Sequence, residues 1–129
     1  MTYNDIVELV DKIGLPCAYD HFTEGDSPEP PFVVFLMPGT NNFFADGVTY
    51  VPITEVNVEL YTDYKNPVLE KLVEDVLDSY ELPWDKTEVW IAEERLYEVL
   101  YTFETIYEQD EEESEDDSED DSGEDTDNG

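Results

Sequence analysis

Residues 31–62 read PFVVFLMPGTNNFFADGVTYVPITEVNVELYT, and this stretch decides the fold. Two runs rich in Val, Ile, Phe and Tyr, Phe32–Met37 and Tyr50–Tyr61, have the composition of strands, because such side chains fit a pleated, half-buried surface. The connector between them holds the turn formers Pro38-Gly39 and Asp46-Gly47. The stretch is therefore predicted to form a β-hairpin with an elaborate tip, and the rest of the chain is expected to cover or extend it.

Amphipathic patterns on either side of this stretch predict two helices. Residues 2–13 place apolar side chains at helical spacing, with Thr2 as the N-cap and Gly14 at the stop. A second helix is predicted to begin at Asn66-Pro67, a capping side chain followed by proline at the first helical position, and to end before Pro83. Its apolar stripe is expected to comprise Val68, Leu69, Leu72, Val73, Val76, Leu77 and Tyr80, with Glu70, Glu74, Asp75 and Asp78 facing away.

Three further strands complete the predicted order α-β-β-β-α-β-β. Cys17–Phe22 is a short candidate strand, and Glu88–Ala92 and Leu96–Tyr107 flank a turn, with period-two alternation in the last of them. Pro52 implies an edge position or a bulge in the strand that contains it. The order predicts an α+β fold, in which two helices pack on one face of a small, mostly antiparallel sheet.

Charge divides the chain into a body and a tail. The whole chain has 36 acidic and 5 basic residues, a formal net charge of −31, and 13 of the acidic residues lie between Gln109 and Gly129. Dense like charge cannot repay an ordering entropy of roughly 1–2 kcal/mol per residue, so residues 109–129 are predicted to be disordered. Residues 1–108 form the predicted single domain, whose excess of carboxylates argues against direct binding of nucleic acid.

The acidic tail lacks the spacing of an EF-hand loop. A solvating or repelling brush is the favoured interpretation, and weak divalent binding and DNA mimicry are the alternatives. No run of about 18 apolar residues and no signal-peptide pattern is present in the sequence, so membrane association is not expected. The single cysteine, Cys17, fits a reducing compartment, and synthesis in the cytoplasm is expected.

The sequence offers no constellation typical of an enzyme. Cys17 and His21 lie four residues apart in a predicted strand, but nothing near them supplies a third orienting group. Motifs for nucleophilic hydrolysis, phosphate binding, metal binding and dinucleotide binding are missing. Neither a catalytic activity nor a cofactor nor a metal is therefore expected.

The connector carries the predicted partner interface. Phe43 and Phe44 are adjacent, so strand alternation cannot point both into one core. One of them is expected to pack under the loop and the other to be exposed, and exposed loop aromatics mark binding surfaces. The alternative is that both pack beneath their own loop. Asn41, Asn42, Phe43, Phe44 and Asp46 are the candidate interface residues.

Three blocks of the chain carry a family resemblance: PFVVFLMPGTNNFFADGVTY, EVNVELYTDYKNPVLEKLVEDVL and EVWIAEERLYEVLYTFE. They resemble small tail terminator proteins, also called tail completion or head–tail joining proteins, of long-tailed phages and prophages of Gram-positive bacteria. The resemblance covers nearly all of residues 1–108 but not the acidic tail. It implies an α/β sandwich with a small sheet and two helices.

The same resemblance implies a structural virion protein at the tail–head junction, assembled in the host cytoplasm. Such a protein forms a ring, expected to be a hexamer, that caps the major tail tube protein and later meets the head–tail connector. In such rings a long hairpin and loops contact the tube, and Gly39–Val48 is the candidate segment here. Two alternatives stay open: a head-completion or connector adaptor, and a small acidic DNA-mimic inhibitor of a host protein.

Overall fold

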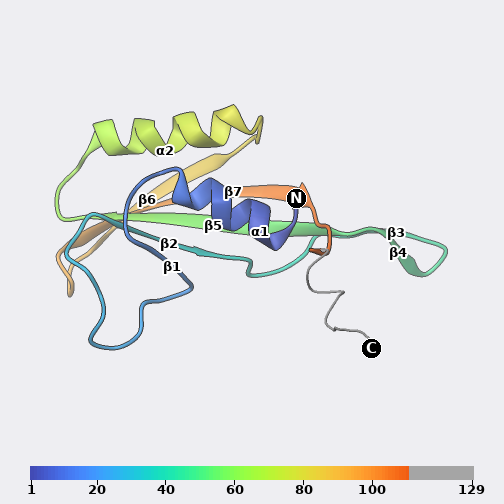
Figure 1. Cartoon of the computed structure of the whole chain (residues 1–129), viewed down its shortest axis with the longest axis horizontal. Helices are drawn as coiled ribbons and strands as arrows, with labels where there is room; N and C mark the ends of the chain where they lie inside the picture. The colour runs from blue at the N-terminus through green and yellow to red at the C-terminus, as the bar shows by residue number, and fades with distance from the viewer. Residues whose placement is uncertain (111–129) are drawn as a thin grey trace, which may run out of the picture.

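A computed structural model describes residues 1–110, which form a five-stranded sheet, a separate two-stranded hairpin and two helices (Figure 1). The elements are α1 (Tyr3–Asp11), β1 (Cys17–Tyr19), β2 (Phe32–Leu36), β3 (Phe43–Ala45), β4 (Val48–Val51), β5 (Ile53–Thr62), α2 (Pro67–Ser79), β6 (Asp85–Ile91) and β7 (Leu96–Ile106). The α+β prediction is confirmed. Of the predicted tail, all but Gln109 and Asp110 lies outside the described residues.

The large sheet has the strand order β1-β2-β5-β7-β6, in which only β1 and β2 run parallel. Strand β5 lies at the centre and pairs with β7 over its whole length, from Ile53 opposite Ile106 to Thr62 opposite Tyr97. Pro52, which has no N–H to donate, separates β4 from β5. The predicted strand Tyr50–Tyr61 is therefore two strands, and its main part is central rather than at an edge.

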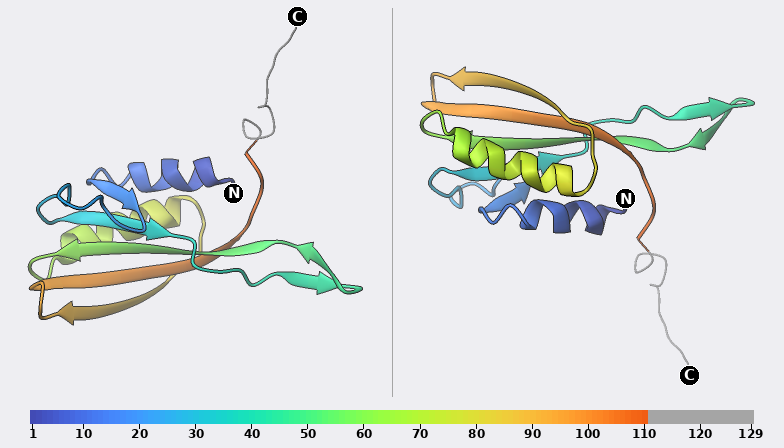
Figure 2. Two further views of the ribbon diagram at one scale, coloured as in Figure 1. Left: turned by 90° about the horizontal axis from the view of Figure 1, so that it is seen from below. Right: turned by 90° about the horizontal axis from the view of Figure 1, so that it is seen from above.

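Both helices cover the same face of the sheet, as the two edge-on views show (Figure 2). Strand β5 alternates between half-buried and fully buried residues, and its buried side chains face the helices. The core between the layers consists of Ile6, Leu9, Val10, Ile13, Val33, Phe35, Val56, Val58, Leu60, Val73, Leu77, Val99, Tyr101 and Phe103. No helix of residues 1–110 lies on the opposite face, here called the outer face.

The helix starts follow the predicted capping chemistry. In α1 the Asp5 backbone N–H donates to the Thr2 hydroxyl at 3.0 Å, and the Thr2 N–H donates to the Asp5 carboxylate at 2.9 Å. Asn66 accepts a hydrogen bond from the Leu69 N–H at 3.2 Å at the start of α2. These bonds satisfy donors that the first helical turn leaves without partners.

The orientation of α2 differs from the prediction at Val68, Glu70 and Leu72, of which Leu72 is 38% exposed. Glu70, which was expected to face away from the sheet, is only 4% exposed, whereas Val68 is 79% exposed. The reason is tertiary: Lys65 and Lys86 each donate to the Glu70 carboxylate, so this acidic side chain turns inward. Pattern alone assigns an acidic residue to the solvent side because it cannot see a cation supplied by another element.

The end of the described chain packs against its beginning. The Glu108 N–H donates to the Met1 carbonyl at 3.0 Å, and the Asn4 N–H donates to the Asp110 carboxylate at 3.3 Å. Asp110 is only 4% exposed, and its negative charge lies at the N-terminus of α1, where the helix dipole favours it. Ordered packing thus extends two residues past the predicted boundary at residue 108.

Candidate functional site

Residues 39–53 form a projecting β-hairpin, here called the arm, that extends beyond the five-stranded sheet (Figures 1 and 2). Its strands β3 and β4 pair antiparallel, with Ala45 opposite Val48. Asp46 and Gly47 between them have φ values of 55° and 79°, the double positive φ of a type I′ turn. At roughly 3.3 Å per residue, the tip lies about 20 Å from Pro52 at the root.

The two predicted asparagines hold the root of the arm to the sheet. The Ile53 N–H donates to the Asn42 side-chain oxygen at 2.8 Å, and the Asn41 N–H donates to the Ile53 carbonyl at 2.9 Å. The Asn41 side-chain amide also donates to the Glu104 carboxylate at 3.1 Å. Asn41 and Asn42 therefore fix the direction of the arm, while the predicted contact surface lies further out.

The outer part of the arm is an exposed apolar surface. Phe43, Phe44, Val48 and Tyr50 are 57%, 64%, 62% and 69% exposed, and the rings of Phe43 and Tyr50 meet edge-on with centroids 6.2 Å apart. Both phenylalanines are exposed, so the expectation that one of them packs under the loop is wrong, and so is the alternative in which both do. Val48 lies in the predicted contact segment Gly39–Val48 but was not named as an interface residue. Tyr50 was assigned to a core strand, because β-rich composition beside a turn is typical of a sheet.

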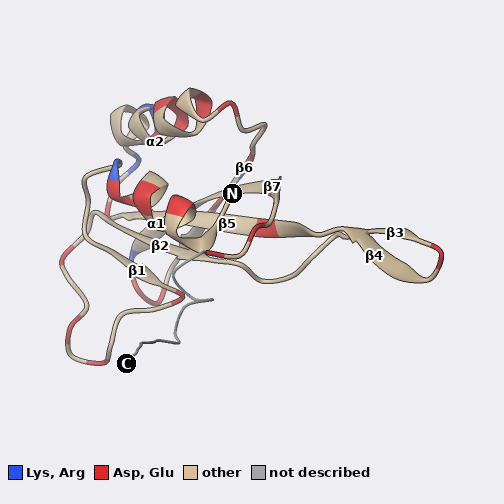
Figure 3. Cartoon of the chain, turned by 45° about the vertical axis from the view of Figure 1, so that its right-hand side comes forward, with Lys and Arg blue, Asp and Glu red and all other residues tan. Residues whose placement is uncertain are grey.

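The arm differs in charge from the acidic body around it. Between Gly39 and Ile53 the only charged residue is Asp46, which marks the tip in Figure 3, whereas carboxylates are spread over the helices and loops. An apolar segment held out into water by its own hydrogen bonds buries little of its surface within its own chain. Exposed apolar side chains on both faces of a projecting hairpin are typical of a protein-binding site.

A small cavity of about 230 Å³ lies at the root of the arm. Its lining contains no charged side chain and consists of Met37, Thr40, Asn42, Pro52, Ile53, Thr54 and Tyr107. Three other clefts each include at least one carboxylate: Glu55, Asp85 and Glu104 in the first, Asp63 in the second, and Asp20 and Glu94 in the third. The cavity, here called the root pocket, is thus suited to an uncharged group.

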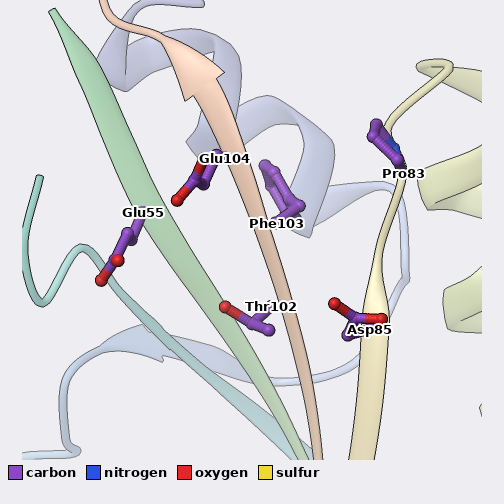
Figure 4. A pocket seen from close by; sticks show the side chains of 6 residues that line it. All are labelled: Glu55, Pro83, Asp85, Thr102, Phe103 and Glu104. Atoms are coloured by element: carbon purple, nitrogen blue, oxygen red, sulfur yellow. The ribbon is translucent and has the colours of Figure 1, made fainter. Parts of the chain in front are cut away.

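The largest of these clefts, about 480 Å³, is acidic (Figure 4). Glu55 and Glu104 lie opposite each other on β5 and β7, and Asp85 on β6 lies opposite Thr102. Facing carboxylates on neighbouring strands repel each other. Within residues 1–110 no group of His, Cys, Asp or Glu side chains has an arrangement that could hold a metal ion. The cleft therefore concentrates negative charge without forming a coordination site.

A second pair of carboxylates on the outer face shares one tyrosine. The Tyr61 hydroxyl donates to Glu59 at 2.9 Å and to Glu98 at 3.3 Å. Burial, together with the negative charges of Glu98 and Asp20, raises the pKa of Glu59. Burial and the Glu59 charge also raise the pKa of Tyr61. The outer face is thus acidic from the Glu55–Glu104 pair to the Glu59–Glu98 pair.

On the helix face, two lysines join α2 to the edge strand β6. Lys86 contacts Glu70 at 2.8 Å and Glu74 at 2.7 Å, and Lys65 contacts Glu70 at 2.7 Å and Glu88 at 2.5 Å. Burial opposes the ionisation of Glu70, but hydrogen bonds from the two lysines outweigh it and lower the pKa of Glu70. This lysine clamp (Lys65, Glu70, Glu74, Lys86 and Glu88) uses two of the chain's five basic residues.

The structure does not bring Cys17 and His21 together as a catalytic pair. The Cys17 thiol donates to the Asp11 carboxylate at 3.5 Å, and burial raises the pKa of this thiol, which disfavours the nucleophilic thiolate. His21 is exposed and contacts its neighbour Asp20 at 2.9 Å. The predicted strand ends at Tyr19, before His21, because Asp20 adopts a φ of 68°.

Neither a model of a known protein family nor a curated protein sequence matches the chain. Among residues 1–110, no helix has the length and the apolar character needed to cross a membrane. The features that bear on function are therefore the chain's own: the apolar arm, the uncharged root pocket and the acidic outer face.

Proposed function

We propose that the chain is a structural virion protein, a tail terminator of a long-tailed phage, which caps the tail tube as an oligomeric ring and helps to join the tail to the head. The observation that carries the proposal is the arm. It projects about 20 Å from the body and presents Phe43, Phe44, Val48 and Tyr50 to solvent. Exposed aromatic side chains on a braced hairpin suit assembly with other protein subunits rather than chemistry.

The resemblance of residues 1–108 to tail terminators supports the proposal through one segment of the chain. It implies that a long hairpin contacts the tail tube protein, and Gly39–Val48, the candidate by its position in the chain, makes up most of the arm. It also implies a small sheet with two helices, which agrees with the α+β body.

Electrostatics is consistent with a ring around a DNA conduit. Binding to DNA is driven by Lys and Arg neutralising phosphates, and this chain has 5 such residues against 36 acidic ones. Three of the four lysines are already paired with carboxylates, namely Lys65, Lys71 and Lys86. A ring built from such subunits repels the genome during its passage instead of retaining it.

The test is electron microscopy of virions made without this gene product. We expect tails of abnormal length that are not joined to heads, and restoration when the intact chain is supplied. Tails of normal length already attached to heads would refute the assignment. Full-length tails beside defective heads would favour the head-completion adaptor.

One observation favours a second candidate, an acidic DNA-mimic inhibitor. The outer face carries a set of negatively charged side chains, as a DNA backbone carries a row of negatively charged phosphates: Glu55, Glu59, Asp85, Glu98 and Glu104. A mimic acts as a monomer or dimer on a basic nucleic-acid enzyme and is displaced by DNA, whereas a terminator binds tube subunits. Measuring binding to tube protein with and without competing DNA separates the two.

A further inference from the structure

The arm and the root pocket are both free of charged side chains apart from Asp46 at the turn, and the exposed rings of the arm do not line the pocket of their own chain. Phe44 lies two residues beyond the pocket-lining Asn42 but is 64% exposed, on a hairpin whose direction is fixed by Asn41 and Asn42. An uncharged, aromatic surface and an uncharged cavity thus sit at two different places on the same molecule. Surfaces arranged in this way form head-to-tail contacts between copies, which close into a ring or continue as a chain.

Charge argues that the partner in this contact is a second copy. Two chains that each carry −31 repel each other wherever their acidic surfaces meet. The root pocket has no charged lining residue, and the arm has only Asp46, at its turn. Contact between the arm and the root pocket therefore buries apolar surface with little electrostatic repulsion between the two copies.

Of the two phenylalanines of the arm, Phe44 is the better candidate to enter the root pocket of another copy. Phe43 already packs against Tyr50, whereas among residues 1–110 no ring contact is recorded for Phe44, which is 64% exposed. The pocket, at about 230 Å³, is of the size of a single side chain rather than of a larger segment. We propose that the arm of one copy inserts Phe44 into the root pocket of the next copy, and that this head-to-tail contact builds the ring.

This inference rests on the proposed function, because it specifies how the ring is held together, and it assigns the arm to the neighbouring copy rather than to the tail tube. The contact is small. Phe44 and its few neighbours on the same face of the arm contribute on the order of 100 Å² each, less than a stable isolated dimer needs, so the assembly depends on ring closure and on protein concentration. Added salt strengthens it, because screening removes the repulsion between copies.

The test is the mass of the purified full-length chain in solution, measured by sedimentation over series of protein and salt concentrations. Phe44→Thr keeps strand propensity but removes the inserted ring, and Thr40→Glu places a charge at the exposed rim of the pocket. We expect each change to weaken self-association roughly 100-fold. The matched controls are Val68→Thr on α2 and Thr87→Glu on β6, both exposed and both outside the contact, and they associate like the unmodified chain.

Mixing the two variants tests the head-to-tail geometry itself. Thr40→Glu copies retain Phe44, and Phe44→Thr copies retain the pocket, so an equimolar mixture forms weak pairs of one copy each and nothing larger, and these pairs are sought at the highest protein and salt concentrations of the series because no ring closure supports them. Urea unfolding of each variant confirms that the fold is intact.

Three results would overturn the inference: an unmodified chain that stays monomeric throughout, a Thr40→Glu variant that assembles normally, or a mixture that forms no pairs. None of these results bears on the tail phenotype seen by electron microscopy, so the contact and the proposed function fail independently.

Discussion

Replacing Lys86 by Met removes the cation shared by Glu70 and Glu74 and keeps most of the buried hydrocarbon stem. Glu70 is 4% exposed and would retain only Lys65 as a partner. Breaking a buried ion pair by removing one partner costs about 3–5 kcal/mol, and the 33% exposure of the Lys86 side chain lowers this value through solvent screening. We expect the free energy of unfolding to fall by about 2–3 kcal/mol.

The matched control is Lys71→Met, which removes the same charge from the same helix. Lys71 pairs with Asp75 at 2.6 Å, but their side chains are 71% and 56% exposed, so we expect a much smaller loss than for Lys86→Met. Unfolding in urea at low salt is the suitable assay, because an ionic denaturant would screen the interactions under test. Equal losses for the two variants, within about 0.5 kcal/mol, would refute the reasoning.

The pH dependence of the unfolding free energy provides a second test with the Lys86→Met variant. The folded-state pKa of Glu70 is lowered, so the stability that its ionised form contributes is present above the unfolded pKa, about 4.3, and is lost as pH falls through the folded pKa. The difference between the original chain and Lys86→Met should therefore shrink on acidification. The double change Glu70→Leu with Lys86→Met should recover stability relative to Lys86→Met alone, because the most deeply buried carboxylate is then removed, whereas Glu74 loses Lys86 in both variants.

Three other changes have expected outcomes that follow from the structure. Glu59→Gln should stabilise the fold at pH 7, because burial raises the folded-state pKa of Glu59 and so penalises its charged form. This gain in stability should vanish below about pH 4, where the carboxyl group is protonated in both the folded and the unfolded state. Urea unfolding at several pH values measures it. Gly14→Ala should cost about 1–2 kcal/mol of unfolding free energy, since Gly14 has a φ of +85° and the added methyl group meets no atom within 4 Å, so the cost is purely conformational. Removing residues 111–129 should leave cooperative melting intact. Removing residues 109–129 should in addition lower the melting temperature, because it deletes the buried Asp110 carboxylate that contacts the N-terminus of α1. Equal melting temperatures of the two truncated chains would count against this role of Asp110.

Local chemistry was enough to predict both helices and most of the sheet. Thr2, Gly14, Asn66 and Pro67 act within a few residues of their own positions, so their effects are visible in the sequence. The run after Pro52 forms a strand for the same reason, since its apolar side chains alternate with polar ones, but its central position in the sheet was not predicted. The parallel pairing of β1 with β2 was not predicted, because nothing in a three-residue strand specifies its partner.

Within the candidate site, the sequence identified the segment but not the role of each residue. Asn41 and Asn42 were grouped with the phenylalanines by proximity in the chain, yet their amides bond to Ile53 and Glu104. The root pocket was invisible in the sequence, because Met37, Pro52 and Tyr107 come from three separate stretches.

The sequence by itself determined the α+β class, the acidic character of the chain and the turn at Asp46-Gly47, because each depends on local propensity or on composition. Only the tertiary structure decided that Glu70 is buried, since its cations come from Lys65 in the preceding loop and Lys86 on another strand. It alone decided that Phe43 and Phe44 stand in solvent. Burial is a property of what surrounds a side chain, and those surroundings are assembled from residues that are distant in the chain.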